Sequence, residues 1–266
     1  MTALNLNDLG GKVALITGAC GALGRSFVEA FAAAGATVAA ADLPGQDPQS
    51  VFRSLPGAER HSAHFADLRD PDQAERLVEE AVSRHSKLDV LVNSAGILEV
   101  ASFLEVSPES FQRTLEVNLV GSFLIAQAAA RQMVKQGTGG QIILVSSNIG
   151  RIPRMNNVSY AVSKAGVNHI VRSMAIELGK YQITANALCP GSCATPMLID
   201  NQASSDPGRL DGIIQGSVEQ WRTGIPMGRL AYPEEQAAMA VFLASEGGRF
   251  ISGQTLCIDG GQTYFT

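Results

Sequence analysis

The chain passes from Lys12-Val13-Ala14-Leu15-Ile16-Thr17 directly into Gly18-Ala19-Cys20-Gly21-Ala22-Leu23-Gly24. The first run is short and apolar, which is typical of a fully buried parallel strand. The second run is a glycine-rich turn, and a helical pattern then continues to Gly35. In such a turn main-chain amides can approach a pyrophosphate, and the helix dipole favours the anion. The stretch predicts a nucleotide site, and a tight turn that binds no ligand is the alternative.

A second apolar run, 37–41, ends at Asp42. An acidic residue at the end of the second strand can accept hydrogen bonds from the adenosine ribose hydroxyls, and it would repel a 2′-phosphate. No lysine or arginine follows until Arg53. These features favour NAD over NADP, although Arg25, in the glycine-rich turn, could meet a phosphate.

Further strands are expected at 61–65, 88–92, 141–145, 184–188 and 253–258, with helices between them. Asp70 and Ser107 are predicted helix N-caps because each precedes a proline at the first helical position. The alternation of strands and helices implies an α/β fold, a doubly wound parallel sheet with helices on both faces. We expect one domain over residues 1–266. Within it, residues 192–228 are expected to be a mobile substrate lid, with one or two short helices around 212–221.

The composition excludes several classes of protein. A chain of 266 residues with 45% hydrophobic content can bury one large core, and its net charge of −5 gives no basic footprint for nucleic acid. Residues 1–8 lack the features of a signal peptide, and no run is long enough to span a membrane, so a cytoplasmic protein is expected. The histidines show no metal-ligand spacing, so no metal site is expected. Four cysteines are expected to be reduced and mostly buried: Cys20, Cys189, Cys193 and Cys257.

Tyr160 and Lys164 lie four residues apart in a predicted helix over about 158–180, so their side chains share one face. A free tyrosine has a pKa near 10, and a neighbouring cation favours the phenolate. We therefore expect Lys164 to lower the pKa of Tyr160, so that the pair can act as a general acid and base. By itself, the spacing also fits an amphipathic helix with a solvent-reaching lysine.

Asn118 lies within an apolar segment of the helix that Ser107 caps. A buried asparagine without hydrogen-bond partners is costly, so this side chain should have a hydrogen-bonding task. The task could be a structural bond to a neighbouring strand or a role in the site.

Taken together, the landmarks are similar to those of the classical short-chain dehydrogenase/reductase family over essentially the whole chain. One departure concerns the glycine-rich turn, where the family usually carries glycine at the position of Ala22 and this chain has Gly21 one place earlier. The landmarks that carry the resemblance are 17–24, Asp42, Asp67, 93–96, Asn118, Ser147, Tyr160 with Lys164, Pro190-Gly191 with Thr195, and 259–261.

The resemblance implies a Rossmann-type fold and NAD(H)-dependent hydride transfer between a secondary alcohol and a ketone. It implies that Tyr160 transfers the alcohol proton, that Lys164 holds the nicotinamide ribose, that Ser147 binds the reacting oxygen and that Asn118 holds a water. Asp67 could accept a hydrogen bond from the adenine amino group, and Thr195 would contact the carboxamide. The expected cofactor-binding residues are Gly18, Gly21, Leu23, Gly24, Asp42, Leu43, Asp67, Leu68, Asn93, Ala95, Gly96, Tyr160, Lys164, Pro190, Gly191 and Thr195.

Within the family, four segments resemble 2,3-dihydro-2,3-dihydroxybenzoate dehydrogenases: 147–148, 153–154, 191–192 and 216–226. This likeness implies a cyclic diol or dihydrodiol carboxylate as substrate. Arg154 could then bind the carboxylate in a bidentate fork, or it could be a surface arginine. Glu99 is expected near the substrate pocket, where its carboxylate would disfavour an acidic substrate and suit a neutral polyhydroxy compound. A sugar or polyol dehydrogenase is therefore the alternative.

Two further alternatives for the function remain, and the resemblance implies self-association of the chain. An NADPH-dependent 3-ketoacyl-carrier-protein reductase would rely on basic residues where Asp42 stands. A non-catalytic NAD-sensing protein would usually lack Tyr160 or Lys164. The resemblance also implies a homotetramer, in which helices around 107–135 and 158–180 pack against symmetry mates.

Overall fold

A seven-stranded sheet forms the centre of the computed structural model, which describes residues 7–53, 55, 57–198 and 208–263. The strand order is β3-β2-β1-β4-β5-β6-β9, and every neighbouring pair is parallel. The order reverses between β1 and β4, which is the point where ligands bind in open α/β sheets. The strands are β1 (Val13–Thr17), β2 (Thr37–Asp42), β3 (Ser62–Phe65), β4 (Val90–Asn93), β5 (Gly140–Val145), β6 (Ile183–Pro190) and β9 (Thr255–Ile258).

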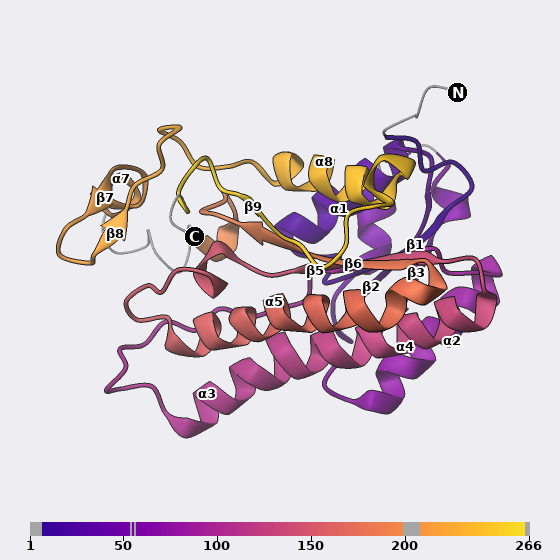
Figure 1. Cartoon of the computed structure of the whole chain (residues 1–266), viewed down its shortest axis with the longest axis horizontal. Coiled ribbons are helices and arrows are strands. Elements are labelled where there is room, and N and C mark those ends of the chain that lie inside the picture. Colours follow the sequence, from indigo (N-terminus) through magenta and orange to yellow (C-terminus); the bar gives the residue numbers. More distant parts are fainter. Residues whose placement is uncertain (1–6, 54, 56, 199–207, 264–266) are drawn as a thin grey trace.

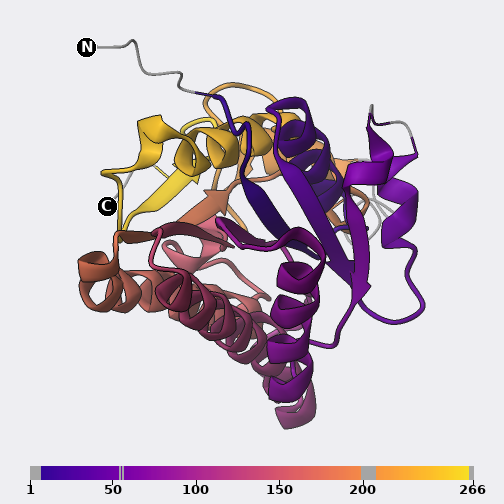
Figure 2. The ribbon, with the colours of Figure 1, turned by 90° about the vertical axis from the view of Figure 1, so that its right-hand side faces the viewer.

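Helices cover both faces of the sheet, as Figures 1 and 2 show. One face is covered by α1 and α8, and the other by α2, α4 and α5. The helices are α1 (Ala22–Ala33), α2 (Pro71–His85), α3 (Pro108–Leu115), α4 (Gly121–Gln136), α5 (Val158–Leu178), α7 (Gly208–Gln215) and α8 (Pro233–Ala244).

Each face has its own hydrophobic core. Phe27 and Phe31 of α1 pack on one face with residues of α8, and both phenylalanines are fully buried. Leu77, Ile125 and Met133 pack on the other face, together with residues of α5. The two cores hold the sheet rigidly between the helices, so the carboxyl ends of the strands form a fixed platform.

The predicted α/β fold is confirmed, and so are both predicted N-caps. The Asp70 carboxylate accepts hydrogen bonds from the main-chain N–H groups of Asp72 and Gln73. The Ser107 hydroxyl accepts a hydrogen bond from the N–H of Ser110. Among the described residues, no helix combines the length and the apolar character that crossing a bilayer requires.

Two local structures differ from the sequence-based expectation. The helix that begins after Ser107 is not uniform, because a π-helical turn, Glu116–Val120, separates α3 from α4. In the expected lid, α7 ends at Gln215, and a hairpin of β7 (Gly216–Ser217) and β8 (Arg222–Thr223) replaces the second half of the predicted helical region. Gly216 adopts a φ of 92°, which a helix cannot continue through. Residues 199–207 of the expected lid lie outside the described residues.

Candidate active site

A cavity of about 540 Å³ lies over the carboxyl ends of β1, β2 and β4, and residues of the glycine-rich turn line it. Gly18 has a φ of 65°, and a Cβ built on it would lie 2.7 Å from the main-chain nitrogen of Ala95. A Cβ on Gly24 would overlap the main-chain oxygen of Gly18. Gly21 is less constrained, because it has a φ of −70° and its Cβ would lie 3.4 Å from the nearest atom. Gly18 and Gly24 therefore keep the turn tight, and the departure at Gly21 and Ala22 leaves both in place.

Asp42 lies at the edge of this cavity, and two main-chain amides hold its carboxylate. Its Oδ2 accepts a hydrogen bond of 2.8 Å from the N–H of Cys20, and its Oδ1 accepts one of 2.8 Å from the N–H of Leu43. Arg25 does not line the cavity; its guanidinium donates to the main-chain oxygen of Cys20 and to the Ser50 hydroxyl. The charge nearest this part of the cavity is therefore negative.

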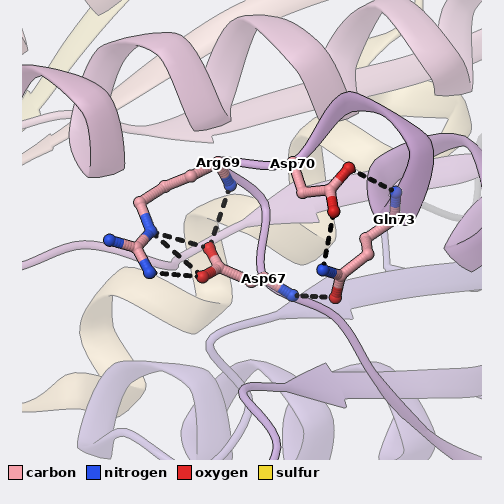
Figure 3. A network of polar contacts seen from close by, with 4 residues as sticks. All are labelled: Asp67, Arg69, Asp70 and Gln73. Carbon is pink, nitrogen blue, oxygen red and sulfur yellow. Dashed lines mark hydrogen bonds and ion pairs between the residues drawn. The ribbon is translucent and has the colours of Figure 1, made fainter.

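Asp67 lines the same cavity and is held by Arg69 (Figure 3). No motif in the sequence marks Arg69. Arg69 Nε donates to both carboxylate oxygens, at 2.9 and 3.0 Å, and these bonds lower the pKa of Asp67. The N–H of Asp67 donates to Gln73, which in turn donates to Asp70. An adenine amino group would share the carboxylate oxygens with Arg69.

A second cavity, of about 620 Å³, brings Ser147, Tyr160 and Lys164 together. Ser147 follows β5, and the other two residues lie on α5. Ser147 and Tyr160 are hydrogen-bonded through their side chains. Lys164 is only 3% exposed, and its Nζ lies 5.5 Å from the centre of the Tyr160 ring. A phenol, a hydroxyl and an ammonium therefore face one space.

The ionisation of the pair differs from the expectation. Burial raises the pKa of Tyr160 to about 12, although its hydrogen bond with Ser147 acts in the opposite direction. Burial also lowers the pKa of Lys164 to about 8. The sequence predicted a lowered pKa for Tyr160 because it revealed the neighbouring cation but not the loss of water around the phenol.

Asn118 is fully buried in the π-helical turn and lines neither cavity. Its Oδ1 accepts a hydrogen bond from the N–H of Ile97, and its Nδ2 donates to the main-chain oxygen of Ile97 and to the Ser163 hydroxyl. A Cβ built on Gly96 would lie 3.2 Å from Asn118 Oδ1 and 3.4 Å from Lys164 Nζ. Asn118 thus makes a structural bond to the segment after β4, and its water-holding role stays a prediction.

Most of the predicted cofactor-binding residues line one or both cavities. Asn93 does not, because its side chain accepts from Thr17 and donates to Ser122 within the packed interior. The predicted residues lining the first cavity are Gly18, Gly21, Leu23, Gly24, Asp42, Leu43, Asp67, Leu68, Ala95, Gly96 and Thr195. Those lining the second are Leu23, Gly96, Tyr160, Lys164, Pro190, Gly191 and Thr195. The residues shared by the two cavities, which we call the common wall, are Leu23, Ser94, Gly96, Thr195 and Met197.

Two arginines give the second cavity a positive character. Arg154 lines it, and its buried Nε and Nη2 atoms have no hydrogen-bond partner among the described residues. Arg222, from β8, also lines it and donates to the Ser192 hydroxyl at 3.0 Å. In the sequence, the one signal that marks Arg222 is its position in the segment 216–226.

Glu99 does not line the second cavity, which corrects its expected position. Its carboxylate accepts a hydrogen bond from the Ser110 hydroxyl and lies 3.5 Å from Arg113 Nη1. Its charge is therefore paired on α3, away from the lining of the second cavity, and does not disfavour an acidic substrate there.

Comparison with known proteins identifies the family. A family model described as enoyl-(acyl carrier protein) reductase matches residues 18–263. The crystal structure of a short-chain type dehydrogenase/reductase from Mycobacterium marinum is 36% identical and superposes with a TM-score of 0.84, over 97% of this chain and 98% of that one. The chain belongs to the classical short-chain dehydrogenase/reductase family. As a member of this family, the chain is an oxidoreductase that acts on alcohols or ketones with a nicotinamide cofactor.

Two relatives act on different substrates. This chain is 37% identical to an L-rhamnose 1-dehydrogenase (NAD(P)(+)) from Sphingomonas sp. (strain SKA58), over 95% of this chain and 96% of the relative. It is 33% identical to a 2,3-dihydro-2,3-dihydroxybenzoate dehydrogenase from Bacillus subtilis (strain 168), over 98% of this chain and 99% of the relative.

Proposed function

We propose that this enzyme uses NAD(H) to interconvert a secondary alcohol and a ketone on a ring that carries a carboxylate, such as a cyclic dihydrodiol carboxylate. The observation that carries the proposal is Arg154, which lines the second cavity and whose buried Nε and Nη2 atoms have no hydrogen-bond partner among the described residues. A buried donor that is left unsatisfied costs about 1–3 kcal/mol, and more when it is charged. A bound carboxylate would satisfy it with a bidentate pair.

Arg154 remains a cation at neutral pH. Burial lowers its pKa to about 10, and the attraction of Asp259 acts in the opposite direction. The Asp259 carboxylate accepts a hydrogen bond of 3.3 Å from the Asn148 amide. An anionic substrate group would therefore meet a protonated guanidinium in a partly desolvated pocket, where the charge pair is stronger than in water.

NAD is the cofactor that the first cavity fits best. The tight turn at Gly18 and Gly24 leaves room for a pyrophosphate near the N-terminus of α1. The fixed carboxylate of Asp42 can accept from ribose hydroxyls, and it would repel a 2′-phosphate. When bound, NAD supplies the hydride acceptor of alcohol oxidation, or the donor of the reverse reaction.

The chain's own residues then supply proton transfer and alignment. Ser147 would hold the reacting oxygen beside Tyr160, whose phenolate would accept the alcohol proton as general base in oxidation and whose phenol would donate it in reduction. The Lys164 ammonium would favour the phenolate, which is the form of Tyr160 that accepts the proton. We further propose that the described parts of residues 192–228 act as a lid, because Met197, Leu198 and Ile213 line the second cavity.

A sugar or polyol dehydrogenase is the second candidate, favoured by the similarity to L-rhamnose 1-dehydrogenase. The 3-ketoacyl-carrier-protein reductase is disfavoured by Asp42, because its usual NADPH carries the 2′-phosphate. Nicotinamide absorbance at 340 nm would be followed with NAD+ and three substrates: a 2,3-dihydroxycyclohexadiene carboxylate, a neutral cyclohexanediol and L-rhamnose. Faster turnover of the carboxylate supports the proposal, and faster turnover of L-rhamnose supports the sugar candidate.

The Arg154→Gln variant gives the sharper test. Loss of a charge-assisted pair worth about 1.5–3 kcal/mol should raise KM for the carboxylate substrate by about 10- to 100-fold, with little change for cyclohexanediol. Arg131→Gln is the matched control, because Arg131 pairs with Glu75 on the helical surface. Equal KM changes for the charged and the neutral substrate would remove the carboxylate from the proposal.

We also propose that the enzyme assembles as a homotetramer. Exposed apolar side chains lie on α4 with its preceding π-helical turn and on α5. They are Val120 in the π-helical turn, Phe123 in α4, and Val162 and Ile176 in α5. A second copy would cover this surface. Light scattering with size-exclusion chromatography measures the mass, and a monomer would contradict the proposal.

A further inference from the structure

Cys189 and Cys257 lie opposite each other in the sheet. They are Cα partners in the parallel pairing of β6 with β9, and both side chains face the core beneath α5. Neighbouring strands are about 4.8 Å apart, which is within the Cα separation of about 4.4–6.8 Å that a disulfide spans. Both cysteines are free, and the Cys189 thiol donates a hydrogen bond to the Cys257 sulfur. The pairing of the strands therefore places the two thiols within reach of each other.

The two thiols have different surroundings. Cys257 is on the edge strand β9 and is partly exposed, and Arg151 Nη1 lies 3.5 Å from its sulfur. The hydrogen bond from Cys189 and the Arg151 cation lower the pKa of the Cys257 thiol. Cys189 is fully buried, its sulfur lies 3.4 Å from Asn168 Oδ1, and its pKa is raised. Cys257 is thus the thiol that ionises and reacts first.

We propose that Cys257 and Cys189 form a redox pair that a peroxide oxidises to an intrachain disulfide between β9 and β6. The Cys257 thiolate attacks a peroxide oxygen, so an S–O bond forms, the O–O bond breaks and water leaves after protonation. The Cys189 sulfur then attacks the sulfenic sulfur, so the S–S bond forms, the S–O bond breaks and a second water leaves. Overall, two thiols lose two electrons and two hydrogens, and one hydrogen peroxide is reduced to two waters.

The pair is placed where oxidation would reach the active site. Cys189 directly precedes Pro190 and Gly191, which line the second cavity. Cys257 lies two residues before Asp259, and a Cβ on Gly191 would lie 2.5 Å from the Asp259 Cβ. A bond between the strands would alter both tightly packed segments. We therefore expect the disulfide to lower turnover, and a thiol reductant to restore it, whichever alcohol is the substrate.

The other two cysteines provide internal comparisons. Burial raises the pKa of Cys193 to about 12, and burial next to Asp42 raises the pKa of Cys20 to about 11. Both thiols are therefore protonated at neutral pH and react slowly with peroxide.

The test maps disulfides in the full-length protein. Reduced protein is treated with one to a few equivalents of hydrogen peroxide, the remaining thiols are alkylated under denaturing conditions, and peptides are analysed without reduction. We expect a cross-linked peptide pair that contains Cys189 and Cys257, with a mass two hydrogens below the sum of the two peptides, which disappears on reduction. Three outcomes would overturn the proposal. Cys189 and Cys257 could both be found alkylated after peroxide treatment, either cysteine could be linked to Cys20 or Cys193, or Cys257 could accumulate as a stable sulfinic acid.

Two variants assign the order of the steps. Cys189→Ala should stop the reaction at oxygen adducts of Cys257, which add one or two oxygen masses. Cys257→Ala should leave Cys189 as an alkylatable thiol. Oxidation of Cys189 in the absence of Cys257 would overturn the assigned order. If either variant does not fold, the wild-type map alone decides whether the disulfide forms.

Discussion

The Lys164 ammonium donates a hydrogen bond of 2.9 Å to the main-chain oxygen of Val145. Val145 is the last residue of β5, and Ser147 follows two positions later. The bond therefore ties α5 to the strand end that carries the serine, and it fixes a buried cation between them. The same bond limits where the ammonium can lie, so its effect on Tyr160 depends on the surrounding burial as well as on distance.

Replacement of Tyr160 by phenylalanine tests the proton transfer. Because general acid–base catalysis contributes about 10²- to 10⁴-fold, we expect Tyr160→Phe to lower kcat by at least about 100-fold while the NAD+ Kd stays within about threefold. Stopped-flow turnover and fluorescence titration of the cofactor measure the two quantities. Tyr181→Phe, at an exposed tyrosine after α5, is the matched control. Retained turnover in Tyr160→Phe would remove the phenol from the mechanism.

The buried Lys164 should reduce stability at neutral pH. Its pKa falls from 10.5 to about 8 because burial disfavours the ammonium, which corresponds to about 3 kcal/mol against the folded state below pH 8. Between pH 8 and 10.5 the unfolded chain binds more protons than the folded chain, so the wild-type protein regains this stability as the pH rises.

The Lys164→Met variant makes this effect measurable. The free energy of unfolding should rise above pH 8 in the wild type but not in this variant. The stability of the wild type relative to the variant should therefore increase between pH 7 and 9.5. Urea unfolding at several pH values measures the difference. Lys135→Met, at an exposed lysine of α4, is the control. A difference that stays constant with pH would contradict the assigned cause.

The charge of Asp42 should determine the choice of cofactor. Asp42→Asn keeps an acceptor oxygen for only one of the N–H groups of Cys20 and Leu43, and it removes the charge that would repel a 2′-phosphate. We expect the ratio of kcat/KM for NAD+ over NADP+ to fall by at least about tenfold. Asp47→Asn, at a surface carboxylate that pairs with Arg53, should leave the ratio unchanged. Equal ratios in all three proteins would rule out the charge as the determinant.

Two glycines of the turn should differ in their tolerance of a methyl group. Gly24→Ala should weaken NAD+ binding or destabilise the protein by about 1–3 kcal/mol or more, because the new Cβ overlaps the Gly18 oxygen. Gly21→Ala should change stability by less than about 1 kcal/mol, since its Cβ makes an ordinary contact and its φ is negative. Thermal unfolding and cofactor titration of both variants test this contrast.

The sequence predicted the strands and the convergence of the candidate catalytic residues because both depend on local signals. Apolar runs ending in glycine or in a polar residue fixed the strand positions, and a parallel sheet brings strand ends to one edge. Tyr160 and Lys164 needed only a helical spacing, and Ser147 needed only the end of the preceding strand.

The rest depends on tertiary contacts that a single sequence does not reveal. The pairing of Glu99 with Arg113, and the burial that raises the pKa of Tyr160, appear only when distant segments are packed. The hairpin after Gln215 depends on the backbone conformation of Gly216. Asn93 was predicted to bind the cofactor, yet its partners come from β1 and α4, which the motif alone could not indicate.

The common wall has a kinetic consequence. Leu23, Gly96 and Thr195 face both cavities, so a dinucleotide that reaches them becomes part of the surface that the alcohol meets. We expect a compulsory order of addition, in which the coenzyme enters first and leaves last. NADH should then compete with NAD+ alone, while the ketone inhibits non-competitively against both reactants.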